Sequence, residues 1–120
     1  MSLRSTDVAS FSHLPSAAAN TNATVVKAQS GRVYAITAYN AAANISYLKL
    51  YNKASAPTVG TDTPVLTIAI GPAQQFNLTV MDVGIYFATG IAYALTTGSA
   101  DSDTGALTAA DVVGLNIMYA

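Results

Sequence analysis

Three aspartates near the end of the chain come closest to a reactive cluster in this sequence. Asp101 and Asp103 are two residues apart in a polar run, and Asp111 follows them. Alternate carboxylates in a loop can converge on one Ca²⁺ ion, but this run has neither the bidentate glutamate nor the fixed glycine of an EF-hand loop. A glycosidase pair is also disfavoured, because the chain has no tryptophan to form a platform for a sugar. We therefore expect a solvated polar loop.

The single histidine, His13, lies beside Leu14 and Pro15 in a segment without regular periodicity. An imidazole that acts in catalysis or binds a metal needs rigid neighbours, and this segment offers none. The eight glycines occur singly, and none of them forms a phosphate-binding loop ahead of a helix. The sequence therefore predicts no catalytic residue, no metal ligand and no cofactor, and we do not expect an enzyme.

Tyr47, Lys49 and Tyr51 alternate along an apolar run in which Leu48 and Leu50 take the other positions. We expect the first three side chains to point outward from a β-strand. A cation between two aromatic rings can stack on a glycan or on a protein partner. Ladders of this kind more often pair across strands or form subunit contacts, and we prefer contact with another subunit.

Charged residues make up 9% of the sequence, whereas soluble domains average about 25%. The chain has three lysines and no glutamate, so Thr, Asn, Ser, Ala and Tyr must occupy its outward positions. Such surfaces lose water easily, as expected of a subunit that packs against neighbours. The basic residues are dispersed and the net charge is −1, so we expect no direct binding of nucleic acid.

Length and composition restrict the architecture further. A chain of 120 residues supports one domain with a single core, and the lack of cysteine excludes disulfides and thiolate metal sites. No apolar run reaches the roughly 18 residues of a membrane span, and the first residues lack the apolar centre of a signal peptide. We therefore expect no membrane partner and assembly in a cytoplasm.

From Thr24 onward, apolar residues recur at every second position, and Gly, Pro, Asn and Asp separate the runs. This pattern predicts about eight strands in an all-β, antiparallel β-sandwich, with a jelly roll as first choice and an immunoglobulin-like Greek key as second. The expected strands are 25–29, 32–42, 45–52, 64–70, 75–80, 85–88, 91–97 and 112–119. The expected core residues are Leu48, Leu50, Leu66, Ile68, Ile70, Phe76, Leu78, Val80 and Leu115.

Residues 1–22 differ from the rest of the chain, since they are rich in Ser, Ala and Asn and show no sustained period. We predict an extended N-terminal arm over residues 1–22 and a β-sandwich domain over residues 23–120. Phe11 and Leu14 are the largest apolar side chains of this segment. Two outcomes are open for the arm: in a free monomer it lies disordered, and in an assembled particle it crosses onto a neighbouring subunit and buries Phe11 and Leu14 there. We expect the second, with both residues as contact residues.

Two long runs of this sequence resemble small all-β structural proteins of tailed bacteriophages. They are YLKLYNKASAPTVGTDTPVLTI, at residues 47–68, and GIYFATGIAYALTTGSADSDTGALTAADVVGLNIMYA, at residues 84–120. The resemblance implies a virion protein, assembled in the cytoplasm of a bacterial host, that decorates or cements the capsid. It carries no catalytic motif.

The partners implied by this resemblance are the major capsid protein or other virion proteins, together with further copies of the chain. A homotrimer is expected, because cement subunits commonly occupy threefold positions of an icosahedral shell. The alternative function is that of a receptor- or glycan-binding module of a phage tail or fibre, for which the outward tyrosines are the evidence.

Overall fold

The computed structural model describes residues 9–80 and 82–120, and within them it has nine strands and no helix. All strand pairs are antiparallel, which confirms the predicted all-β sandwich. Eight of the nine strands fall between Thr24 and the C-terminus, as the alternating pattern predicted. The strands are β1 (Ser10–Ser16), β2 (Thr24–Lys27), β3 (Gly31–Asn40), β4 (Ser46–Asn52), β5 (Leu66–Ile70), β6 (Gln74–Thr79), β7 (Ile85–Phe87), β8 (Ile91–Thr96) and β9 (Val112–Tyr119).

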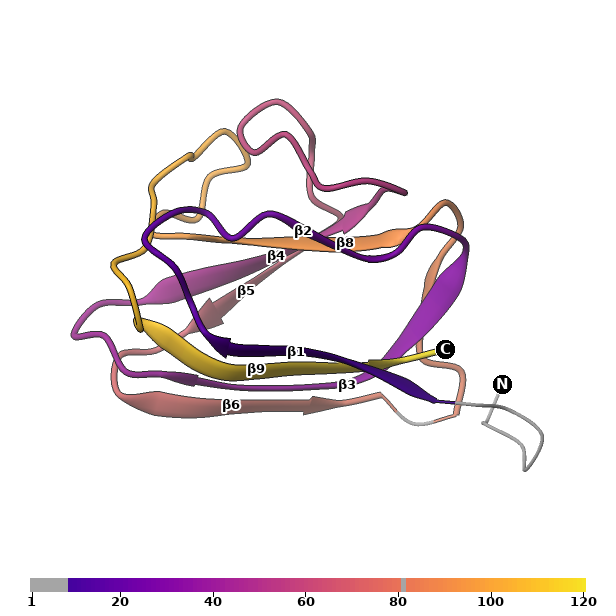
Figure 1. The fold of residues 1–120 in the computed structure, drawn as a ribbon, viewed down its shortest axis with the longest axis horizontal. Coiled ribbons are helices and arrows are strands. Elements are labelled where there is room, and N and C mark those ends of the chain that lie inside the picture. Colours follow the sequence, from indigo (N-terminus) through magenta and orange to yellow (C-terminus); the bar gives the residue numbers. More distant parts are fainter. Residues whose placement is uncertain (1–8, 81) are drawn as a thin grey trace.

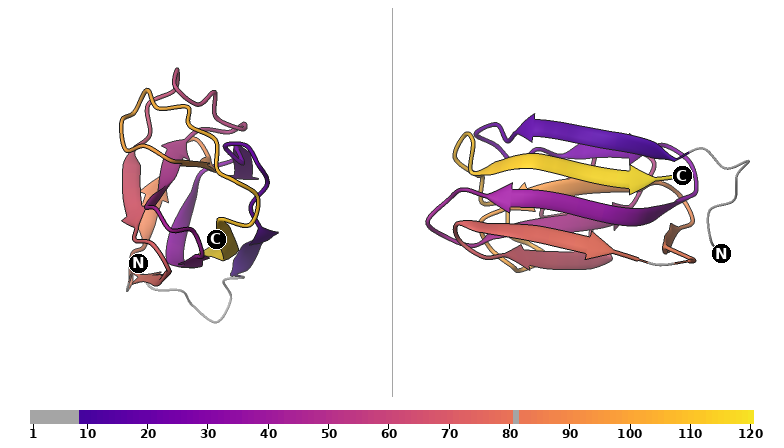
Figure 2. Two further views of the ribbon diagram at one scale, coloured as in Figure 1. Left: turned by 90° about the vertical axis from the view of Figure 1, so that its left-hand side faces the viewer. Right: turned by 90° about the horizontal axis from the view of Figure 1, so that it is seen from below.

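The strands form two packed sheets (Figure 1). Sheet A has the order β1-β9-β3-β6, with the short β7 beside the start of β3, and sheet B has the order β2-β8-β4-β5. From below, β1, β9, β3 and β6 lie side by side as one continuous surface (Figure 2, right). The pairs β1–β9, β2–β8, β3–β6 and β4–β5 are nested along the chain, as when one long antiparallel ribbon is rolled into two sheets. This is the strand order of a jelly roll, our first choice.

The hydrophobic core fills the space between the inner faces of the two sheets. Leu48, Leu50, Ile70 and Leu115 are buried there, as predicted. Four predicted core residues are only half-buried against it, because β5 and β6 are edge strands: Leu66, Ile68, Phe76 and Leu78. Val80 is half-buried just beyond the end of β6. Strands β3, β7, β8 and β9 contribute further buried residues: Val33, Ile36, Phe87, Ile91, Tyr93, Leu95, Val112 and Ile117.

Strand β1 lies within the segment predicted as an N-terminal arm. It pairs with β9 from Ser10 opposite Tyr119 to Ser16 opposite Val113, so this part of the segment belongs to the sandwich of its own chain. Leu14 packs against the core, and Ala17, just after β1, is buried in it. The sequence of β1 does not show a clear alternation of apolar and polar residues, because the small polar residue Ser12 lies on the same inward side as Leu14. Residues 1–8 of the expected arm lie outside the described residues.

Candidate functional site

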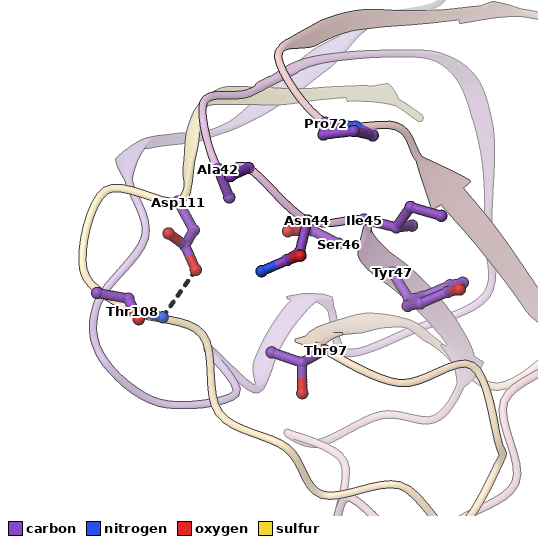
Figure 3. Close-up of a pocket in the computed structure, with 10 residues that line it drawn as sticks. Ala42, Asn44, Ile45, Ser46, Tyr47, Pro72, Thr97, Thr108 and Asp111 are labelled. Atoms are coloured by element: carbon purple, nitrogen blue, oxygen red, sulfur yellow. Dashed lines mark hydrogen bonds between the residues drawn. The ribbon is translucent and has the colours of Figure 1, made fainter.

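An open recess lies at one end of the sandwich, where three connections meet (Figure 3). These are the β3–β4 connection, the β5–β6 turn and the β8–β9 connection. The recess has a volume of about 720 Å³. Its lining residues are Ala42, Ala43, Asn44, Ile45, Ser46, Tyr47, Pro72, Thr97, Thr108 and Asp111.

The buried side chain of Asn40, at the end of β3, holds two of these connections in place. Its amide nitrogen donates to the carbonyl oxygens of Asn44 and Ile70, both at 2.9 Å, and of Gly71 at 3.1 Å. Its amide oxygen accepts from the backbone N–H of Ala42 at 3.0 Å and from the Ser46 hydroxyl at 3.3 Å. A buried amide with this many partners fixes the wall of the recess, because breaking any bond leaves a polar group without a partner.

The β8–β9 connection forms the opposite wall through Asp111. One carboxylate oxygen of Asp111 accepts a hydrogen bond from the backbone N–H of Thr108 at 2.8 Å (Figure 3, dashed line). The carbonyl oxygen of Asp111 accepts from the backbone N–H of Ala41 at 2.7 Å, which joins this wall to the β3–β4 connection. The recess is therefore held by hydrogen bonds on both sides without a ligand.

The aspartates of the β8–β9 connection do not act as one unit. Asp103 accepts a hydrogen bond from the backbone N–H of Gly105, and Asp111 is engaged at Thr108. Asp101 is exposed. Within residues 9–80 and 82–120, no group of three or more His, Cys, Asp or Glu side chains could hold a metal ion.

The expectation that Lys49 and Tyr51 are outward contact residues is wrong, since both are buried. They do lie on the outer face of sheet B, but the β4–β5 and β8–β9 connections arch over that face (Figure 1, top). Small residues of β8 leave room for them, with Ala94 opposite Lys49 and Ala92 opposite Tyr51. The alternating sequence pattern predicted the correct face of the sheet for these side chains, but it did not indicate that two connections cover that face.

Each buried polar group below this cover has a distinct environment. The ammonium nitrogen of Lys49 donates to the carbonyl oxygens of Ala100, at 2.6 Å, and Asp103, at 3.4 Å. The hydroxyl of Tyr51 is buried and has no hydrogen-bond partner among the described residues. Burial raises the pKa of Tyr51, and the negative charges of Asp62 and Asp101 raise it further.

The β4–β5 connection is held by internal hydrogen bonds and an ion pair, and it packs against the β8–β9 connection. Lys53 and Asp62 form an ion pair, and the hydrogen bond from Lys53 lowers the pKa of Asp62. Asp62 also accepts from the backbone N–H of Thr58 at 2.7 Å. Gly60, with φ of +90°, lies so close to Thr104 of the other connection that a β-carbon would overlap it. Glycine is required there for both conformation and space.

Most of the outer face of sheet A is accessible and has no charged residue; Arg32, opposite Tyr86 where the start of β3 pairs with β7, is the exception at one end. Outward side chains of neighbouring strands lie opposite one another on this surface. Phe11 of β1 is opposite Met118 of β9, which in turn is opposite Ala35 of β3. Phe11 is 68% exposed. Away from that end, the surface that we call the neutral face has no Lys, Arg, Asp or Glu among its described side chains. Its side chains are Phe11, His13, Ala35, Thr37, Tyr39, Gln75, Asn77, Thr79, Asn116 and Met118.

A row of hydrogen-bonded side chains crosses the middle of the neutral face. His13 Nδ1 is hydrogen-bonded to the amide oxygen of Asn116, whose amide nitrogen donates to the Thr37 hydroxyl at 3.3 Å. Next to this row, Phe11, Ala35 and Met118, with Thr37 and Asn116, line a hollow of about 110 Å³. The face thus has a polar row beside an apolar one.

The predicted contact residues do not form one site. Phe11 lies on the neutral face and is accessible, whereas Leu14 packs inward in the same strand. Tyr47 is half-buried at the recess, apart from both. Tyr39 and Met118 were not predicted as contact residues, although their outward positions in alternating runs and the few charged residues around them were signals of an accessible face.

Comparison with protein-family models, with curated protein sequences and with solved structures finds no match to this chain. Among the described residues, no helix is long and apolar enough to cross a membrane.

Proposed function

We propose that this protein is a structural virion subunit of a tailed phage, which packs through its neutral face and decorates or cements the capsid. Its proposed partners are other copies of the chain, as a homotrimer, and the major capsid protein or another virion protein. The observation that carries the proposal is the neutral face, the uncharged part of the outer surface of sheet A, with Phe11 exposed at its edge.

The energetics of burial favour this face as a contact surface. Burying a charged side chain that has no partner costs much free energy, whereas the free-energy cost of desolvating amides and hydroxyls is smaller and apolar groups gain from burial. Burying Phe11 alone contributes roughly 1.5–3 kcal/mol. Aromatic residues and methionine are enriched at interface centres, where charged residues are depleted, and Tyr39 and Met118 fit that composition.

Several charged side chains elsewhere are engaged within the chain. Lys53 pairs with Asp62, and Lys49 is enclosed below the β8–β9 connection. The guanidinium of Arg32 lies 4.7 Å from the centre of the Tyr86 ring and donates to a backbone carbonyl. These interactions leave the neutral face without a nearby basic patch that would recognise nucleic acid or an anionic surface.

The fold is compatible with the proposal. Jelly rolls recur in viral capsid proteins and in lectins. Because one fold supports many functions, the fold alone does not decide between these classes, and the neutral face carries the argument.

The proposal is tested by placing a charge in the middle of the neutral face. In Thr37→Lys and Asn77→Lys, an ammonium group would have to be buried on assembly, so binding to particles that lack the protein should fall at least tenfold. Thr61→Lys is the matched control, since Thr61 is exposed on the β4–β5 connection. Sedimentation of the free proteins and the number of bound copies per particle give the two measurements.

Loss of binding in both neutral-face variants, with normal binding of Thr61→Lys, is the expected result. Normal oligomers and normal occupancy for Thr37→Lys and Asn77→Lys would refute the neutral face as the contact surface. In the virion, a decoration protein should be present in hundreds of copies on the head, whereas a few dozen copies on the tail would reject the capsid role.

A further inference from the structure

The recess at the end of the sandwich presents a mixture of groups that the proposed assembly role does not use. Asn44 points into the middle of the recess, between Asp111 on one side and Tyr47 on the other (Figure 3). The Asn44 amide has no side-chain hydrogen bond to any described residue, so it can both donate and accept. Ile45 and Pro72 provide apolar surface at the rim.

The charge of the recess selects among ligand classes. Asp111 is the one formally charged side chain among the described residues that line it, and no Lys or Arg is among them. A phosphate, a carboxylate or a nucleic acid would therefore meet repulsion without a compensating cation. One carboxylate oxygen of Asp111 is engaged at Thr108, which leaves the other able to accept from a ligand hydroxyl.

These groups match the chemistry of a sugar ring. A pyranose has apolar C–H faces, which pack on an aromatic ring, and an edge of hydroxyls, which donate and accept hydrogen bonds. Tyr47 provides the aromatic ring, while Asn44 and Asp111 provide polar groups beside it. The volume of about 720 Å³ falls in the range of ligand-binding clefts and has room for more than one ring.

The walls of the recess are already in place without a ligand. Asn40 fixes the β3–β4 connection and the β5–β6 turn, and the hydrogen bond from Ala41 to the carbonyl oxygen of Asp111 joins the third wall. Binding would therefore order few additional loop residues, which reduces its entropic cost.

We propose that this recess binds a neutral carbohydrate, with Tyr47 as the stacking surface and Asn44 and Asp111 as hydrogen-bonding groups. The proposal replaces a glycan platform formed by Tyr47, Lys49 and Tyr51, because two of those side chains are buried. It does not depend on the neutral face, which lies on the outer surface of sheet A.

Saturation-transfer NMR on the full chain tests this proposal. The probes are glucose, galactose, mannose, rhamnose and N-acetylglucosamine, with linear oligosaccharides of each, at about 10 mM, roughly ten times a millimolar Kd. Binding of the single sugars would indicate recognition of one ring, and binding of the oligosaccharides alone would indicate recognition of a polysaccharide chain. Either result supports a carbohydrate site once the variants below locate it at the recess.

Three variants decide whether bound sugar occupies the recess. Asn44→Ala and Tyr47→Ala should weaken binding by about tenfold or more, since they remove the hydrogen bonds and the stacking surface. Tyr86→Ala is the control, because Tyr86 is exposed beside Arg32 and absent from the recess. If Tyr47→Ala does not fold, Asn44→Ala decides alone, since the Asn44 side chain is exposed and has no hydrogen bond to a described residue.

Transfer to none of the probes would overturn the proposal, as would unchanged binding in Asn44→Ala. Neither result bears on assembly, which the lysine variants of the neutral face test separately.

Discussion

The ammonium nitrogen of Lys49 in β4 lies 2.6 Å from the carbonyl oxygen of Ala100 in the β8–β9 connection. Lys49 has no exposed surface. An enclosed ammonium group has to keep its hydrogen-bond acceptors, because losing them leaves a desolvated charge without compensation. Lys49 thus holds the β8–β9 connection down onto the outer face of sheet B.

Replacing Lys49 should loosen that connection. In Lys49→Met the apolar stem remains while the hydrogen bonds to Ala100 and Asp103 are lost, so amide hydrogen exchange over residues 98–105 should accelerate. Lys49→Ala should also lower the free energy of unfolding by about 2–5 kcal/mol, because it leaves a cavity. Lys27→Met, in the edge strand β2, is the control, and exchange that stays the same in Lys49→Met would contradict this role.

Two buried tyrosines should respond in opposite ways to loss of the hydroxyl. The Tyr51 hydroxyl has no partner among the described residues, so Tyr51→Phe should raise the free energy of unfolding by about 1 kcal/mol. The Tyr93 hydroxyl interacts with the side chain of Thr24, its partner across the β2–β8 ladder, so Tyr93→Phe should lower the free energy of unfolding by about 1 kcal/mol. Chemical denaturation of the two variants beside the parent protein measures both effects. Destabilisation by Tyr51→Phe would indicate that its hydroxyl has found a partner such as water.

Stability should decline in alkaline solution because of the same two residues. Burial raises the pKa of Tyr51 and of Tyr93, although the interaction with Thr24 opposes the rise at Tyr93. Above the unfolded-state pKa of about 10, the unfolded chain loses these protons while the folded chain keeps them, so stability is complete below that pH and falls as the pH rises. Melting temperatures from about pH 8 to about pH 12 measure the decline.

The double variant Tyr51→Phe, Tyr93→Phe provides the comparison for this pH dependence. Its melting temperature should decline less steeply than that of the parent above about pH 10. Parallel curves for the two proteins would mean that other groups cause the alkaline loss.

Strand β1 provides a matched pair of substitutions that distinguishes packing from surface contact. Leu14→Ala should lower the free energy of unfolding by about 1–3 kcal/mol, because Leu14 packs against the core. Phe11→Ala should change it by less than about 0.5 kcal/mol, because Phe11 is exposed. Thermal unfolding of the two variants checks the difference, and equal effects would contradict the inward packing of β1.

Some of this structure could be predicted from residue order alone. A strand alternates its side chains between two faces, so the run around Leu48 and Leu50 identified a core face without reference to other strands. Strand order was harder, because nothing in the residues of β1 specifies that β9 is its partner. The inward position of small Ser12 also weakened the alternation in β1.

The environment of Lys49 could not be predicted in this way. Alternation assigns it to a face, but the cover over that face comes from connections distant in sequence. Ala92 and Ala94 were an overlooked signal, since two small residues on the adjacent strand leave space for large side chains beneath a loop. The recess was equally hidden, because its walls come from three connections that only the jelly-roll order brings together.

The position of β9 between β1 and β3 has a consequence for how the chain folds. Strand β9 pairs with β1 and β3, which are both distant from it in the sequence. The chain therefore loses loop-closure entropy before these contacts form, and proteins with such pairings fold in roughly milliseconds to seconds. During that interval β1 and β3 present unpaired edges. Strand β1 of a second chain can pair with β9 in the same position, so refolding at high concentration should yield domain-swapped dimers. Refolding at low concentration should favour monomers in which β1 pairs with β9 of its own chain.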